Sequence, residues 1–206
     1  MLALAGSLAL AAGWALGASG LLGAILALGG AGVLWRVAQL AQDGLATAAA
    51  ATSDAEARVA FDEGVGFARE ARWPEALAAF QRSHALVARP NTALNVAVAL
   101  RQLGRLRAAR EALRACVAMP ETAAEPDVGR DAALLLGLVV DAIARLSLTV
   151  EPDGAAVQVD GEAAPDPRAV ELDPGAHTVT VVAPGRAQET FTMEVRAGER
   201  VARTVR

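Results

Sequence analysis

Hydrophobic and polar residues follow three different patterns along the chain. Residues 1–35 carry no charged side chain at all. From about 57 to 119, apolar residues recur every three or four positions, which predicts amphipathic helices. From Leu146 onward they alternate with polar residues, which predicts short strands. We therefore expect an α+β multidomain protein with four parts. These are a hydrophobic segment (1–36), a linker or frayed helix (37–56), a helical region (57–145) and a β-domain (146–206).

The uncharged N-terminal run is long enough to cross a membrane once, because one spanning helix needs roughly 20 apolar residues. Trp14 and Trp35 lie about 31 Å apart along a helix, which would place one indole at each interface. We expect one span near 14–35. Two alternatives stay open: a tight helical hairpin turning at 17–20, and an export signal cleaved near 46–48.

The middle of the chain predicts two helical hairpins, each ending at a proline. Pro74 suits the first turn of its helix, and Gly64 would let the partner helix approach closely. Asn91 and Asp127 are predicted N-caps. An almost wholly apolar stretch, "AALLLGLVV", indicates a closing helix wedged between the hairpins and the β-domain. The expected helices are 57–70, 74–88, 91–103, 105–118 and 127–145.

The first hairpin, "FDEGVGFAREARWPEALAAFQRSHALVARP", resembles a tetratricopeptide repeat. The second, "NTALNVAVALRQLGRLRAAREALRACVAMP", is a weaker copy that lacks the motif's early Trp and Gly. The resemblance implies a concave surface that holds a peptide or protein partner. The motif positions are Gly64, Phe67, Ala76 and Phe80 in the first unit and Gly104, Ala109 and Leu113 in the second. The partner-binding residues that the resemblance implies are Asn91, Asn95, Arg101 and Gln102.

The C-terminal part predicts six or seven short strands with tight turns between them, as in a small β-sandwich. Its segments "LSLTVEPDGAAVQVDG" and "LDPGAHTVTVVAPG" resemble a PEGA domain, although "EAAPDPR" replaces the family's usual Gly-Thr-Thr-Pro stretch. The resemblance implies a non-catalytic module of a bacterial envelope protein. His177, which follows the turn at 173–175, is expected to make a structural hydrogen bond.

Charge is distributed unevenly. Residues 57–118 hold ten Arg against five acids, whereas residues 121–175 hold twelve acids against three Arg. Three interpretations stay open: a solvated surface, docking of the two halves on each other, and an acidic partner for the basic half. No aromatic residues interleave with the arginines at 101–114, so we expect no nucleic-acid binding.

The sequence offers no catalytic, cofactor or metal site. The two histidines, His84 and His177, are too few for a His-rich cluster. His84 and Cys116 fall on helical faces, where a packed ring and a small buried hydrophobe are expected. The acid pairs Asp153/Asp160 and Asp166/Asp173 lack the spacing of a calcium loop.

The uncharged N-terminal run and the two resemblances together imply a non-enzymatic scaffold for protein–protein interaction, associated with the membrane at a bacterial envelope. The alternative is a structural module that contacts cell wall or surface polymer through its β-domain. We expect an inner-membrane protein whose soluble part faces the periplasm. Arg36, the first charge after the apolar run, favours the opposite, cytoplasmic-facing topology, and a cleaved signal would make the protein exported.

Overall fold

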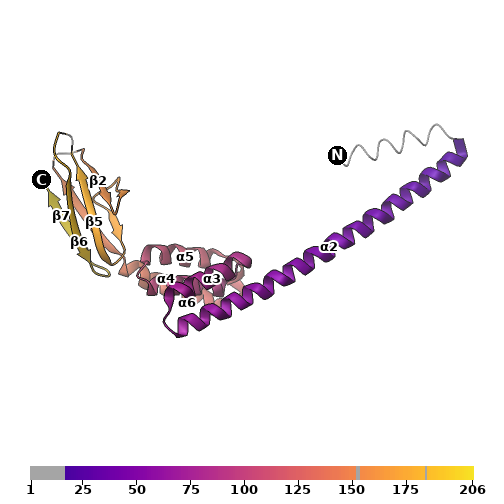
Figure 1. Ribbon diagram of the computed structural model, residues 1–206, viewed down its shortest axis with the longest axis horizontal. Helices are drawn as coiled ribbons and strands as arrows, with labels where there is room; N and C mark the ends of the chain where they lie inside the picture. The colour runs from indigo at the N-terminus through magenta and orange to yellow at the C-terminus, as the bar shows by residue number, and fades with distance from the viewer. Residues whose placement is uncertain (1–16, 152–153, 184) are drawn as a thin grey trace. The chain divides into compact units, whose positions relative to one another are not determined.

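The computed structural model describes residues 17–151, 154–183 and 185–206 and has an α+β architecture (Figure 1). The chain divides into two compact units, Met1–Ser53 and Asp54–Arg206. The helices are α2 (Gly17–Arg69), α3 (Trp73–Leu86), α4 (Pro90–Gln102), α5 (Leu106–Ala118), the 3₁₀ helix η1 (Pro120–Ala124) and α6 (Pro126–Ala142). The strands are β1 (Ala144–Val150), β2 (Ala156–Val159), β3 (Glu162–Ala163), β4 (Val170–Leu172), β5 (Gly175–Val182), β6 (Glu189–Val195) and β7 (Arg200–Val205).

Helix α2 continues without a break through 37–56, the segment predicted as a linker or frayed helix. Its composition explains this, because alanine has the highest helix propensity and no proline interrupts the segment. Thr47 and Thr52 each donate their hydroxyl to the carbonyl four residues earlier, so both hydroxyls have partners within the helix. Trp14, one end of the predicted span, lies outside the described residues. In the described part of the chain, no helix is both long and apolar enough to cross a membrane.

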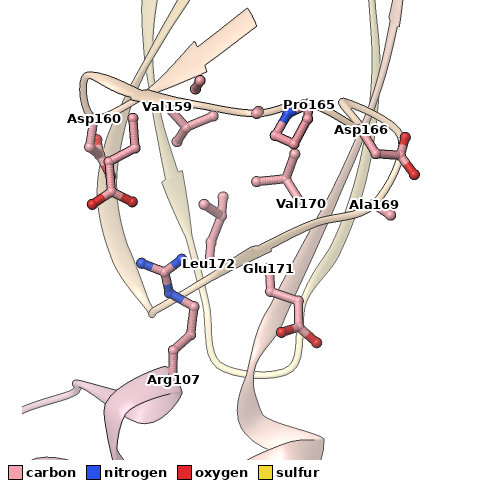
Figure 2. Close-up of a pocket in the computed structure, with 12 residues that line it drawn as sticks. Arg107, Val159, Asp160, Pro165, Asp166, Ala169, Val170, Glu171 and Leu172 are labelled. Atoms are coloured by element: carbon pink, nitrogen blue, oxygen red, sulfur yellow. The ribbon is translucent and has the colours of Figure 1, made fainter.

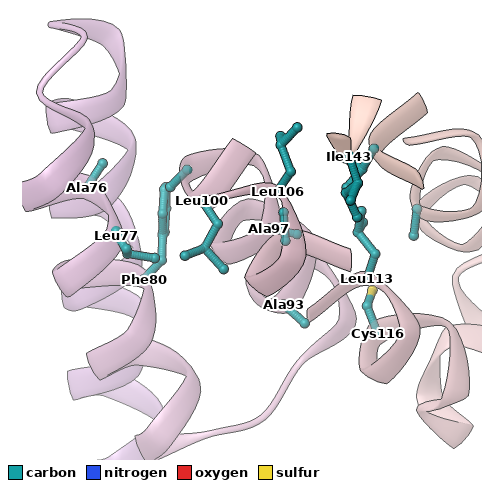
Figure 3. Close-up of a cluster of buried hydrophobic side chains, with 14 residues drawn as sticks. Ala76, Leu77, Phe80, Ala93, Ala97, Leu100, Leu106, Leu113, Cys116 and Ile143 are labelled. Carbon is teal, nitrogen blue, oxygen red and sulfur yellow. The ribbon is translucent and has the colours of Figure 1, made fainter. Parts of the chain in front are cut away.

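The end of α2 packs on α3 through the glycine that the sequence singled out. A Cβ added at Gly64 would lie 2.6 Å from ring carbons of Phe80, closer than real contacts allow. Phe80 is fully buried and also contacts Phe61, with ring centroids 5.5 Å apart. The two hairpins and α6 then share one hydrophobic core, part of which is drawn in Figure 3. The buried motif positions are Gly64, Ala76, Phe80, Ala109 and Leu113.

Prolines, rather than the predicted caps, begin three helical segments. Pro90 and Pro126 occupy the first turns of α4 and α6, and Pro120 begins η1. Proline suits this position because its missing N–H needs no partner there. Asn91 and Asp127 therefore lie inside the helices, so their predicted role as N-caps is wrong. The predicted start of α3 is confirmed, with Trp73 first and Glu75 in the first turn.

Helix α6 is covered on one side only. Val139 and Ala132 are fully buried against the helical core, whereas Leu134 and Leu138 are 64% and 61% exposed. The expectation that the β-domain would cover the remaining sides of this helix is wrong for these two leucines. The contact between α6 and the β-domain is instead at the end of the helix, where the Gly198 N–H donates to the Ala142 carbonyl over 2.7 Å.

The β-domain is built from two sheets that share one core. One sheet has three strands in the order β4-β1-β7, and the other has four in the order β3-β2-β5-β6. Strand β1 runs antiparallel to β4 and parallel to β7. The predicted alternation is confirmed: Leu146 and Leu148 in β1, and Val179 and Val181 in β5, point into the core, while their neighbours in sequence are more exposed.

Candidate functional site

Helix α4 carries the four residues that were predicted to bind a partner. Asn91, Arg101 and Gln102 are exposed and Asn95 is half-buried. Residues 91, 95 and 102 share one helix face at spacings of four and seven, whereas Arg101 is turned about a quarter of a revolution from it. The opposite side of α4 is packed into the core through Ala93, Ala97 and Leu100. The structure thus brings three of the four residues onto one surface stripe.

Asn91 and Asn95 form a fixed pair on this stripe. The Asn95 amide nitrogen donates to the Asn91 backbone oxygen over 2.8 Å and to the Asn91 Oδ1 over 3.2 Å. The bond to a backbone oxygen determines which end of the Asn95 amide is nitrogen. Consequently Oδ1 of Asn95 and Nδ2 of Asn91 are left as one acceptor and one donor, with no hydrogen bond to other described residues.

The N-terminus of α5 is capped by the β-domain. The Arg107 backbone N–H donates to Oδ1 of Asp173 over 2.8 Å, and no residue of α5's own N-terminal turn supplies a side-chain cap. Asp173 lies in the turn between β4 and β5. A carboxylate at this place satisfies an otherwise unpaired N–H and favours the helix dipole. Sequence reasoning missed this contact, because the two residues are 66 positions apart.

Three residues further along α5, Arg110 binds Glu171 of β4. The guanidinium Nη1 lies 2.5 Å from Oε2 of Glu171, and the Arg110 side chain is only 16% exposed. The hydrogen bond with Glu171 raises the pKa of Arg110 above its usual value, although burial opposes it. Both contacts join a basic helix to the acidic β-domain, so docking of the two halves accounts for part of the uneven charge distribution.

His177 connects two turns of the β-domain. Its Nδ1 lies 2.6 Å from Oδ2 of Asp160, and its Nε2 lies 2.6 Å from the Asp173 backbone oxygen. Both partners are acceptors, so both bonds form only when each ring nitrogen carries a hydrogen. Burial raises the pKa of the Asp160 carboxyl, but hydrogen bonds from His177 and the Thr178 N–H outweigh it, and the pKa lies below its ordinary value. The predicted structural role of His177 is confirmed.

A hollow of about 430 Å³ lies beside these contacts, between α5 and strands β2 to β4 (Figure 2). The side chain of Arg107 extends toward it from the helix, and the carboxylates of Asp160 and Glu171 lie at its edges. Its lining contains neither a hydroxyl, a thiol nor a histidine. The ring of His177 is held by acceptors at both nitrogens, so it is not placed to take a proton from a nucleophile. This hollow is lined by four carboxylates and one guanidinium, so it can hold a polar ligand.

The remaining candidate residues have structural roles. Cys116 is fully buried, its Sγ lies 3.4 Å from the Pro90 carbonyl, and burial raises the pKa of its thiol. His84 packs as a ring with a buried Nδ1. Asp166 accepts a hydrogen bond from the Arg168 N–H. Asp153, which was paired with Asp160 in the sequence, lies outside the described residues. In the described part of the chain, no three His, Cys, Asp or Glu side chains are grouped closely enough to hold a metal ion.

No protein-family model matches the chain, and no curated protein matches it. The resemblances to tetratricopeptide repeats and to a PEGA domain therefore stay predictions. What the structure adds is the architecture itself: helices that share one hydrophobic core, followed by a two-sheet β-domain.

Proposed function

We propose that this protein is a non-enzymatic interaction scaffold at a bacterial envelope, whose helical hairpins hold an extended peptide of a protein partner. The observation that carries the proposal is the polar stripe on α4, formed by Asn91, Asn95 and Gln102 on a helix whose other side is buried. The backbone of α4 that carries this stripe is held in place, because the buried side of the helix packs into the hydrophobic core of the hairpins. Tetratricopeptide-like packing of the hairpins is part of the same proposal.

The asparagine pair suits a peptide backbone. Asn95 Oδ1 accepts and Asn91 Nδ2 donates, and a peptide group offers one N–H and one C=O to match them. The bond that Asn95 already makes to Asn91 fixes its side chain before the partner arrives. Less rotamer entropy is then lost on binding. Arg101, at the side of the stripe, would attract an acidic residue or the carboxyl end of such a peptide.

The test uses the full chain in nonionic detergent micelles and a display library of random peptides. Peptides selected on the wild-type protein are measured against Asn95→Ala, which removes the pair. Gln81→Ala is the matched control, because it also removes an exposed amide but lies on α3. We expect Asn95→Ala to weaken binding at least tenfold and Gln81→Ala to leave it within twofold. Equal affinity for wild type and Asn95→Ala, or no selected peptide, would overturn groove binding.

We further propose that residues 1–36 hold the protein in the inner membrane and that the part from 57 onward faces the periplasm. The uncharged run and the PEGA-like sequence support this placement, and the single charge of Arg36 opposes it weakly. Protease added to intact spheroplasts tests it. Digestion of the 57–206 part supports periplasmic placement, protection until lysis contradicts it, and release as soluble protein indicates a cleaved signal.

A second candidate function is contact with cell-wall or surface polymer through the β-domain. The observation that favours it is a group of arginines on the outer face of the three-stranded sheet, Arg145, Arg168 and Arg200. Sedimentation with purified peptidoglycan tests this function. A wall-binding module would be found in the pellet, whereas a scaffold with protein partners alone would stay in the supernatant.

A further inference from the structure

The outer face of the sheet β4-β1-β7 is hollowed over about 500 Å³. Three arginines line this hollow, and Glu171 is the only acid among the lining residues. Arg145, Arg168 and Arg200 are all exposed, and none of them lies within 4 Å of a carboxylate in the described part of the chain. We call these three residues the arginine cluster.

The strand register places two members of the arginine cluster directly beside each other. Arg145 of β1 is the Cα partner of Arg200 of β7. Paired residues on neighbouring strands point to the same face and lie about 5 Å apart. Like charges directly opposite each other are destabilising, so this pair costs folding free energy that an anion bound between them would recover.

The third member is held at the edge of the same face by the loop between β3 and β4. The Leu148 N–H of β1 donates to the Pro167 carbonyl over 2.7 Å, which fixes the loop against the strand just before Arg168. The Arg168 N–H is bound to Asp166 Oδ1 over 3.0 Å. Arg168 thus extends from an ordered turn.

The acids nearest to the arginine cluster are occupied elsewhere. Glu171 is the cross-strand partner of Arg145, yet its carboxylate is bound by Arg110 of α5. Glu199 precedes Arg200 in sequence, but its Oε2 accepts the Arg196 N–H over 2.7 Å. Docking of α5 on the β-domain thus engages the Glu171 carboxylate, and no carboxylate in the described part of the chain lies within 4 Å of the three guanidinium groups.

Beyond the arginines, the outer face of β1 and β7 carries small and hydroxyl side chains. Thr149 is paired with Thr204, and Ser147 with Ala202. Thr149, Ala202 and Thr204 are exposed and Ser147 is half-buried, so no large side chain obstructs this strip. A long ligand laid along the strands would meet hydrogen-bonding hydroxyls at one end and positive charge at the other.

We propose that the arginine cluster binds the carboxylate groups of an acidic polysaccharide lying along β1 and β7. Guanidinium groups bind carboxylates through two parallel hydrogen bonds, and the hydroxyl strip matches the sugar hydroxyls. The proposal rests on the second function proposed above, contact with wall or surface polymer, and names the chemistry that the contact uses. It is independent of peptide binding on α4.

The test measures binding of oligogalacturonate, a carboxylate-bearing glycan, to the full chain in nonionic detergent micelles by calorimetry. The test variant is Arg145→Gln with Arg200→Gln. The control variant is Arg186→Gln with Arg196→Gln, which removes two exposed arginines from the same β-domain. Neutral dextran oligomers of equal length and nonionic micelles that also contain phosphatidylglycerol serve as the other two probes. Circular dichroism checks that each variant is folded.

We expect the test variant to bind oligogalacturonate at least tenfold more weakly, and the control variant to stay within twofold of wild type. Binding should weaken as salt rises, because the contact replaces counterions. Equal binding of dextran, or binding of the phosphatidylglycerol micelles alone, would overturn the proposal. If wild type sediments with peptidoglycan but oligogalacturonate binding does not depend on Arg145 and Arg200, the arginine site is wrong while the wall-contact function stands. If the site binds the glycan and nothing sediments, the site stands and the wall is not the source.

Discussion

At the scale of single residues, close packing of the helical core requires a glycine at one position, where any side chain would collide with a neighbouring ring. Gly64 is buried against Phe80, and no other residue type leaves room for the ring. Gly66 lies two residues further along the same helix, but a Cβ there would meet nothing within 4 Å. Substitution by alanine at these two positions therefore distinguishes two effects. At Gly64 the added methyl group meets a steric barrier, whereas at Gly66 it changes only the helix propensity.

We predict that Gly64→Ala destabilises the protein by about 1–3 kcal/mol, because the added methyl forces Phe80 and its helix apart. Gly66→Ala should instead stabilise it by up to roughly 1 kcal/mol, since alanine favours an exposed helix over glycine. Urea denaturation followed by circular dichroism measures both changes. The same sign for both variants would contradict the close packing of Gly64 on Phe80.

The depressed pKa of Asp160 predicts a contribution to stability that depends on pH. Because its folded-state pKa lies below the unfolded value of about 3.9, the contribution is full above that value and is lost as pH falls through the folded pKa. The variant Asp160→Asn keeps the acceptor for the Thr178 N–H but cannot carry the charge. We expect wild type to be more stable than this variant at pH 5, and the difference to shrink by pH 3. A constant difference would show that the carboxylate charge is not involved.

At the scale of helices and strands, the sequence predicted most elements because each has its own periodicity. The strands at 170–172, 175–182 and 200–205 match the predicted alternation within a few residues. The helix starts were predicted less well, because Asn91 and Asp127 looked like caps while the preceding prolines already form the first turns. A cap supplied by a distant turn, as for α5, has no local sequence signal.

The distant cap of α5 leads to a prediction about Asp173. Asp173→Ala should cost about 1 kcal/mol, since it leaves the Arg107 N–H without its side-chain acceptor. Asp173→Asn should lose less, because an asparagine oxygen caps a helix nearly as well as aspartate. Denaturation gives the free energies, and amide hydrogen exchange at Arg107 reports the cap directly. Unchanged exchange at Arg107 in Asp173→Ala would show that the cap does not operate in solution.

At the scale of the whole chain, the two proposed binding surfaces differ in how far apart their residues lie in sequence. Arg145 and Arg200 are 55 positions apart in sequence and become neighbours through the parallel pairing of β1 and β7. Asn91 and Asn95 are one helical turn apart, so the sequence could identify them as a pair. The α4 stripe was therefore predictable from a local pattern and the arginine cluster was not, because strand order and register are not encoded in any one segment.

The last prediction concerns the ion pair that joins α5 to β4. Reversing one charge, in Arg110→Glu or in Glu171→Arg, places like charges together and should destabilise the protein. The double variant restores an opposite pair, so its loss should be smaller than the sum of the single losses by about 1 kcal/mol, a modest value because Glu171 is 36% exposed. The control is Arg114→Glu. Arg114 has an exposed side chain on the same helix and contacts only Glu111 among the described acids, so this variant should show no coupling to Glu171→Arg.

The coupling free energy between Arg110 and Glu171 is measured by a double-mutant cycle in urea. If it is zero, Arg110 and Glu171 do not join the two parts in solution. If it is favourable, Glu171→Arg should in addition strengthen oligogalacturonate binding, because it adds a fourth arginine to the hollow that Glu171 lines.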